Sequence, residues 1–151
     1  MKKLISIMTF LAMICTVPAW AFDINPENVT ASKGATINVP VTIKNIHSAI
    51  EANAIGFTVK YDGDILSFVG PDIKGSLVES FTLVEGKENS PGVAKIGGSY
   101  FTDKVFLTDG LLLNITFKVK EDASGKSKVE LSDFKDALKG ATGGSSTVLL
   151  K

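Results

Sequence analysis

The chain has 151 residues, and its 16 basic and 16 acidic side chains balance to a formal net charge of zero. This length corresponds to one ordinary domain that can bury a sizeable core. Arginine is absent and the lysines are scattered, which excludes the basic footprint of a nucleic-acid-binding protein and a polybasic membrane patch.

The first 21 residues are typical of a secretory signal peptide. Lys2 and Lys3 form a basic start, residues 4–17 are apolar but too short to span a bilayer, and Ala19-Trp20-Ala21 is a small-x-small cleavage site. We expect cleavage after Ala21, which leaves a single domain of residues 22–151. This domain is predicted to be exported, either to the periplasm or to the cell exterior, without a membrane span.

Cleavage would also remove every cysteine from the protein. Cys15 lies in the signal peptide, and Ile14 before it is too bulky for lipoprotein processing. The mature domain therefore has neither a disulfide nor a thiol nucleophile. Loss of Lys2 and Lys3 shifts its net charge to −2.

Apolar and polar residues alternate along most of the mature chain, which predicts short β-strands. Turn residues separate these strands every 8–12 residues, and no βαβ alternation is present, so the predicted fold class is all-β, a sandwich. The clearest strand is 109–120, in which five apolar residues alternate with mostly polar ones. In chain order the expected strands are 22–29, 36–44, 54–62, 65–69, 81–85, 93–101, 109–120, 126–131 and 147–151.

Five local features lead to further expectations. Pro40 cannot donate a ladder hydrogen bond, which predicts an edge strand or a bulge. Gly97-Gly98 predicts a bulge or a close backbone approach, and residues 86–92 are expected to form a polar turn. Residues 132–140 suit either a helical turn or an irregular loop. Leu112 is out of phase with its strand and is expected either under a loop or in an exposed apolar patch.

No set of residues predicts catalysis or a cofactor. Asp62 and Asp64 around Gly63 could begin a calcium loop, but that ion needs six or more oxygens, so a turn is favoured. His47 has no second ligand at a recognisable spacing and is interpreted as a loop residue. The acidic residues lie mainly in turns, and no carboxylate pair is set up for glycoside hydrolysis. We predict a protein that is not an enzyme and needs neither a metal nor a cofactor.

One row of small residues is the best candidate for partner binding. The outward positions of two predicted strands would form a flat, mildly apolar face, which is either an interface or a solvated sheet. Tyr100 and Phe101 are consecutive, so one of them faces outward if the strand continues, and the alternative is a buried aromatic. The candidate partner-binding residues are Ala54, Gly56, Thr58, Lys60, Lys95, Gly97, Ser99 and Tyr100.

The succession of these strands resembles the cohesin domain family. The matching segments, which cover nearly all of the mature chain, are 34–41, 54–62, 65–68, 75–77 and 110–119. The resemblance implies a nine-stranded jelly-roll sandwich, a fold shared with some carbohydrate-binding modules. It also implies a non-catalytic adaptor that binds dockerin modules on other secreted proteins, often polysaccharide-degrading enzymes. Calcium in such complexes belongs to the dockerin, so none is implied in this chain.

Three hypotheses about function follow. The first is an exported module that docks a dockerin-like module or another surface protein, although the strand that resembles the family's recognition strand is less polar than a tight pair would need. The second is a carbohydrate-binding module, against which the loss of Trp20 with the signal peptide counts. The third is a structural subunit of a surface assembly that associates through its edge strands.

Overall fold

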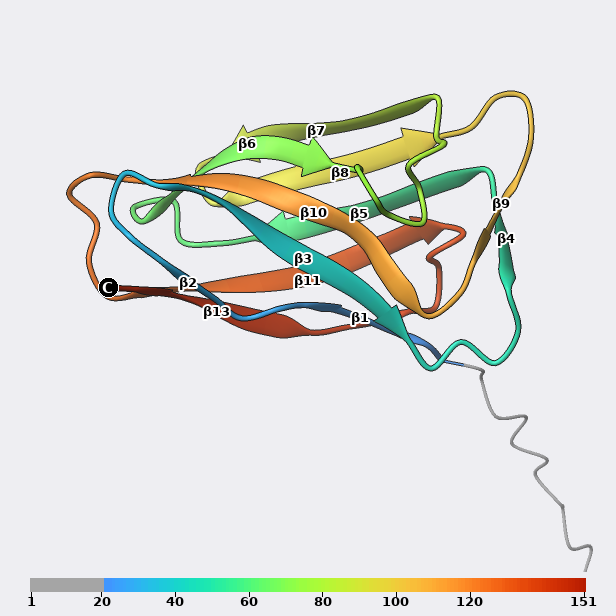
Figure 1. Ribbon diagram of the computed structural model, residues 1–151, viewed down its shortest axis with the longest axis horizontal. Coiled ribbons are helices and arrows are strands. Elements are labelled where there is room, and N and C mark those ends of the chain that lie inside the picture. The colour runs from blue at the N-terminus through green and yellow to red at the C-terminus, as the bar shows by residue number, and fades with distance from the viewer. Residues whose placement is uncertain (1–20) are drawn as a thin grey trace, which may run out of the picture.

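A computed structural model describes residues 21–151, and it contains strands, turns and loops but no helix in that range. The predicted signal peptide lies outside the described residues except for Ala21. Figure 1 shows an elongated body of two β-layers that face each other. The predicted all-β sandwich is therefore confirmed.

Nine strands build the two layers, and they correspond one to one to the nine predicted strands. Their bounds are Asp23–Pro26 (β1), Thr36–Lys44 (β3), Ala54–Lys60 (β5), Leu66–Asp72 (β6), Leu83–Ser90 (β7), Val93–Ser99 (β8), Gly110–Val119 (β10), Lys126–Asp136 (β11) and Ser145–Leu150 (β13). Four shorter strands supplement them, namely Val29–Ala31 (β2), Ile50–Ala52 (β4), Val105–Leu107 (β9) and Thr142–Gly143 (β12).

The strands form two main sheets and one small ribbon. The first sheet has the order β12-β1-β3-β10-β6, and the second has the order β2-β13-β11-β5-β8-β7. The ribbon pairs β4 with β9 and lies at one end of the sandwich (Figure 1). Because neighbours in both sheets are often far apart in sequence, the surface of each sheet is assembled from distant segments.

The core lies between the two sheets and consists of the inward positions of the alternating strands. Phe117 of β10 is fully buried at its centre. Its ring meets the ring of Tyr61 edge-on at a centroid distance of 5.0 Å and that of Phe68 at 6.1 Å. Edge-to-face geometry suits the charge distribution of aromatic rings, so this cluster ties the two sheets together.

Two predicted ends of strands were wrong. The segment 86–92 is not a polar turn, because β7 continues through Ser90 and pairs with β8 along its length. Residues 132–140 form no helical turn at their start, because β11 continues to Asp136. A bulge between Ser132 and Lys135, with Asp133 and Asp136 at positive φ, lets the strand carry polar residues there without losing its pairing with β5.

The expectation that Pro40 marks an edge or a bulge was also wrong. β3 lies between β1 and β10, and no register shift occurs at Pro40. The carbonyl of Pro40 accepts a hydrogen bond of 2.8 Å from the backbone N–H of Glu27, just beyond the end of β1. Pro40 has no N–H group, but the β1 ladder has already ended at this position. No ladder hydrogen bond is therefore lost there.

The two expectations about glycine and leucine were resolved by packing. No register shift occurs at Gly97-Gly98, and a methyl group on Gly98 would lie 2.9 Å from Val84 Cγ2, which is a close approach rather than a bulge. Leu112 and Leu113 are both fully buried, because a bulge lies between Leu111 and Leu113. Of the two alternatives for Leu112, the exposed apolar patch is therefore wrong.

Candidate interaction face

Antiparallel pairing of β5 with β8 brings seven of the eight candidate residues onto one face. Ala54 lies opposite Ser99, Gly56 opposite Gly97, and Thr58 opposite Lys95, while Lys60 lies opposite Val93 at the end of the ladder. The name outer strip is used here for these seven residues: Ala54, Gly56, Thr58, Lys60, Lys95, Gly97 and Ser99. Each belongs to the side of the sheet that points away from the core.

The centre of the outer strip is hollowed rather than flat. Gly56 and Thr58 are buried, although their strand positions point outward. They line a shallow hollow of about 270 Å³ together with Gly97, Lys95 and polar residues from the bulge in β11. A methyl group on Gly56 would lie 3.5 Å from Lys135 Cβ, so the neighbouring strand walls this hollow on one side. Gly97 on the other side of the hollow is exposed, so its backbone is open to a partner.

Strands β7 and β11 widen the face with residues that the sequence did not single out. Lys87 lies opposite Lys95, and Glu85 lies opposite Gly97. On the other side, Glu130 lies opposite Lys60 and Ser132 opposite Thr58. Lys87 and Ser132 lie in segments that were expected to be turn or loop, and the order of the strands was not readable from the sequence. Only the fold could therefore identify these residues as neighbours.

One charged group on this face has a perturbed pKa. Lys128 Nζ donates a hydrogen bond of 2.7 Å to Glu130 Oε2, and this bond with the Lys128 charge holds the pKa of Glu130 below its usual value. The charge of Lys60 acts in the same direction. The pair is exposed, so it orients two side chains more than it stabilises the fold.

The eighth candidate, Tyr100, does not share the face. Its ring stacks on Phe81 at a centroid distance of 6.3 Å and an interplanar angle of 6°, against the core. Phe101 is the outward member of the pair and is 72% exposed. The sequence showed that one of these two aromatics must face outward, but only the packing of Phe81 decided which one.

The segment around Asp62 and Asp64 forms a turn in the structure. Asp62 Oδ1 accepts a hydrogen bond of 2.9 Å from the backbone N–H of Asp64, which is the local bond of an Asx turn. Asp62, Asp64 and Asp122 line one shallow hollow on the surface. Among residues 21–151, no group of three or more His, Cys, Asp or Glu side chains is arranged to hold a metal ion.

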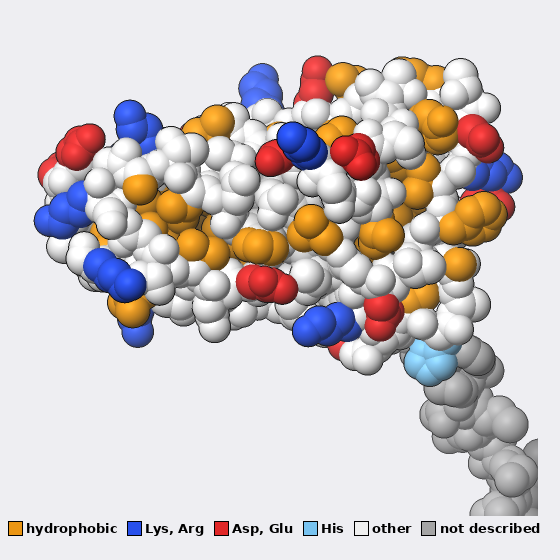
Figure 2. All heavy atoms as spheres, in the orientation of Figure 1, with side chains coloured by type: hydrophobic (Ala, Val, Ile, Leu, Met, Phe, Trp, Pro, Cys, Tyr) orange, Lys and Arg blue, Asp and Glu red, His pale blue; other side chains and the backbone are white. Residues whose placement is uncertain are grey.

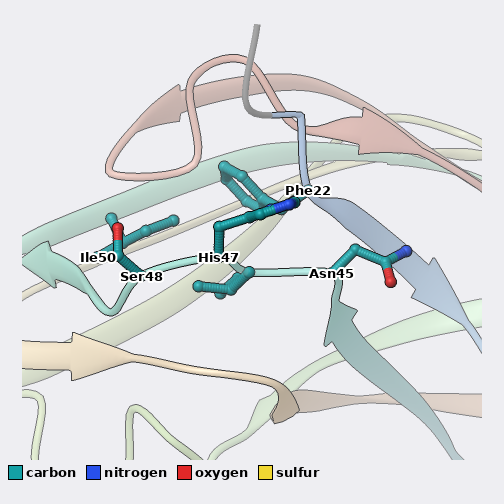
Figure 3. Close-up of a pocket in the computed structure, with 6 residues that line it drawn as sticks. Phe22, Asn45, His47, Ser48 and Ile50 are labelled. Carbon is teal, nitrogen blue, oxygen red and sulfur yellow. The ribbon is translucent and has the colours of Figure 1, made fainter. Parts of the chain in front are cut away.

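His47 lies in a small hollow of about 130 Å³ beside the end of β3. Figure 3 shows its ring and that of Phe22 directed into this space, together with Ser48 and Ile50. The side chain of Asn45 turns away and donates a hydrogen bond of 2.6 Å to Asp23 Oδ2. No aspartate or glutamate lines the hollow, so its walls hold no acid that could serve a hydrolytic reaction.

The opposite face of the sandwich differs in chemistry. Figure 2 views the molecule with β3, β6 and β10 toward the reader, and charged side chains of both signs are scattered over this side. Threonines and asparagines project from the middle strands of that sheet, and Thr116 Oγ1 donates a hydrogen bond of 2.7 Å to Asn38 Oδ1. Side chains of this face hydrogen-bond to one another, whereas the outer strip leaves glycine backbone and lysines available to a partner.

Two of the four edge strands of the sandwich, β6 and β7, are poorly suited to strand addition. Val69 is the bulged residue of β6 and has no partner in the β10 ladder, and Pro71 follows it. Strand β7, the other edge on that side, carries Glu85, Lys87 and Glu88. Bulges, proline and charge are features that oppose edge-to-edge pairing. The edges formed by β6 and β7 therefore do not favour self-association into a fibre.

The fold and this face define a class of protein: a two-layer β-sandwich module with an open sheet surface. A family model described as the cohesin domain matches residues 22–146, and the chain belongs to that family. It is also 25% identical over 150 residues to a cellulosome-anchoring protein of Acetivibrio thermocellus, a match that covers 88% of this chain but 33% of that relative. The chain thus spans about a third of the relative's length.

Solved cohesin structures have the same fold. The sixth cohesin of scaffoldin B from Acetivibrio cellulolyticus, solved with a Cel5 dockerin mutant, superposes with a TM-score of 0.69 at 22% identity and covers 87% of this chain and 99% of that one. A non-cellulosomal cohesin from Archaeoglobus fulgidus gives a TM-score of 0.62 at 20% identity, with 87% and 91% covered. In the described part of the chain no helix is long and apolar enough to cross a membrane.

Proposed function

We propose that this protein is an exported, non-catalytic binding module that docks a dockerin-like helical module, or another secreted protein, through its outer strip. Two structural neighbours are cohesins solved with dockerins, from A. cellulolyticus and from Clostridium thermocellum, and they support this class of partner. A link to polysaccharide degradation is part of the same proposal, because a cellulosome-anchoring protein is among the relatives. Export, to the periplasm or the cell exterior, depends on the predicted signal peptide.

The pairing of Gly56 with Gly97 is the observation on which the proposal depends. Two glycines directly opposite each other leave no side chain at the centre of a sheet face that otherwise carries lysine, serine and threonine. A helix can approach such a spot closely, and small residues at a contact permit dense packing. A face with no role would gain strand stability from larger residues at both positions.

The test is binding of purified residues 22–151 to a panel of dockerin modules by calorimetry. The panel includes the A. cellulolyticus Cel5 dockerin. Gly97→Trp should block docking without disturbing the core, because an added Cβ there would meet nothing closer than Ile55 O at 3.8 Å. Thr36→Trp, on the exposed outer side of the other sheet, is the matched control. Equal binding by both variants would refute the proposed face.

Carbohydrate binding is retained as a second candidate because two aromatic side chains are exposed at one end of the sandwich. Phe101 is 72% exposed and Phe106 is 59% exposed. Exposed aromatic rings are stacking platforms for sugars. Retardation in polysaccharide affinity gels that is lost in Phe101→Ala would support this function, and absence of retardation on plant and bacterial polysaccharides would exclude it. Tyr100→Ala is less informative because Tyr100 packs against the core.

A further inference from the structure

Two lysines face each other directly at one end of the outer strip. Lys87 of β7 lies opposite Lys95 of β8, and both side chains are exposed. Lys60 belongs to the next row along β5, beyond Thr58. Like charges directly opposite each other destabilise an antiparallel pair. The fold therefore carries an electrostatic cost at this point, which a negatively charged partner would remove.

The protein supplies little neutralisation for this lysine group. The ion pairs among residues 21–151 are Lys104 with Glu51 and Lys128 with Glu130, and neither includes Lys60, Lys87 or Lys95. Three acids lie nearby in the sheet: Glu85 is one row away along β7, Glu88 follows Lys87 in the same strand, and Glu130 is already bonded to Lys128. Asp133 and Asp136 line the central hollow together with Lys95, but neither forms an ion pair with it.

The other end of the same strip is uncharged and partly apolar. Leu83 lies opposite Ser99, which in turn lies opposite Ala54, and Leu83 is 43% exposed. Phe101 follows two residues after Ser99, and its backbone N–H donates to Thr82 Oγ1 at 3.4 Å. Lys87 is four positions from Leu83 along β7, a distance of about 13 Å at the rise of an extended strand.

We propose that this gradient orients the partner: the docked element lies along β5 and β8 with carboxylates over Lys87 and Lys95 and an apolar side chain over Leu83 and Phe101. The inference rests on the proposed docking function and specifies the chemistry of the partner. On a helix, residues seven or eight apart share a face and are separated by about 10.5–12 Å. The partner is therefore a dockerin-like helix whose acidic and apolar contact residues lie about two turns apart, with Gly56 and Gly97 beneath the middle.

The experiment compares two charge reversals with the same change in net charge. Lys87→Glu/Lys95→Glu alters the lysine row, and Lys44→Glu/Lys118→Glu alters exposed lysines on the outer side of the other sheet. Binding is measured against the dockerin panel at low and high salt. The first variant should lose at least about tenfold in affinity, because the attraction that speeds association is removed. It should also lose most of the salt dependence of binding, because salt screens that attraction. The second should bind like the parent protein.

Two further measurements test the direction in which the partner's helix lies along the outer strip. Leu83→Asp should weaken binding while the salt dependence remains, because it alters the apolar end. Acid-to-lysine substitutions on the partner's helix should restore binding to Lys87→Glu/Lys95→Glu only when they lie at the end over the lysine row. If dockerins bind the parent and both double variants equally, the gradient is overturned while docking stands. If no dockerin binds the parent protein, both the docking proposal and this inference fall.

Discussion

Gly97 and Gly98 are neighbours in β8, but an added Cβ would meet open surface at the first and packed atoms at the second. At Gly97 the nearest atom would be Ile55 O at 3.8 Å, whereas at Gly98 it would be Val84 Cγ2 at 2.9 Å, followed by Leu83 O and Phe81 Cδ2 at 3.1 Å. The two glycines therefore serve different purposes, one on the outer strip and one against the core.

This contrast predicts opposite tolerance to alanine. Gly98→Ala should lower the free energy of unfolding by about 1–3 kcal/mol, because the new methyl group overpacks Val84 and Phe81. Gly97→Ala should change it by about 0.5 kcal/mol or less, since exposed positions away from tight contacts are permissive. Urea denaturation of both variants measures the difference. Equal destabilisation would show that β8 does not pack as described.

Tyr61 predicts a loss of stability at alkaline pH. Burial, followed by the nearby carboxylate of Glu88, raises the pKa of the Tyr61 hydroxyl well above its usual value near 10. The folded state then holds the proton more tightly than the unfolded state, so this contribution is complete below pH 10 and is lost as the pH rises above it. The slope is at most about 1.4 kcal/mol per pH unit for one group.

The measurement compares the parent protein with Tyr61→Phe by urea denaturation between pH 7 and 11. Among the described residues no group forms a well-aligned hydrogen bond with Tyr61 Oη, although Glu88 and the backbone of Gly92 lie close enough to act on its pKa. The phenylalanine variant should therefore fold with nearly unchanged stability at pH 7. Above pH 10 the parent should lose stability relative to the variant. Parallel curves over the whole range would show that the Tyr61 hydroxyl titrates normally.

Asp109 predicts a local effect on the loop after β3. Its carboxylate accepts hydrogen bonds from the backbone N–H groups of Asn45 at 3.3 Å and Ile46 at 2.9 Å, and Asn45 has a φ of 65°. Asp109→Ala removes this acceptor from both donors at an exposed site and should cost about 0.5–1.5 kcal/mol. Amide hydrogen exchange at Ile46 should accelerate more than exchange in β10. Uniform acceleration throughout the domain would argue for global rather than local opening.

The bulge in β10 predicts that Leu112 and Leu113 matter equally to stability. Both side chains are fully buried, whereas Leu111 before them is only partly buried. Leu112→Ala and Leu113→Ala should each cost about 2–5 kcal/mol, because a large buried side chain leaves a cavity. Leu111→Ala is the matched control and should cost clearly less. A small effect of Leu112→Ala would place this side chain outside the core.

The sequence alone was sufficient for the fold class and for the position of every main strand, because period-two alternation is a local property. The strand at 109–120 illustrates this, since its inward residues Ile115, Phe117 and Val119 are all fully buried. The same alternation placed Gly56, Thr58 and Lys60 on one side of their strand. It failed at Leu112 and in β11, because a bulge changes the phase without leaving a clear mark in the sequence.

Only the tertiary structure decided which strands lie beside β5 and β8, and therefore which side chains complete the face. Lys87 is eight residues from Lys95 in the sequence, and the two lie opposite each other only because β7 and β8 form a hairpin with this register. The sequence instead predicted a polar turn over residues 86–92, which would have kept Lys87 out of the sheet. The sequence left open whether Tyr100 or Phe101 faces outward, and the position of Phe81 decides that the Tyr100 ring is the covered one. Alternation specifies a side of a strand, whereas neighbours across a sheet depend on pairing between segments that local sequence does not encode.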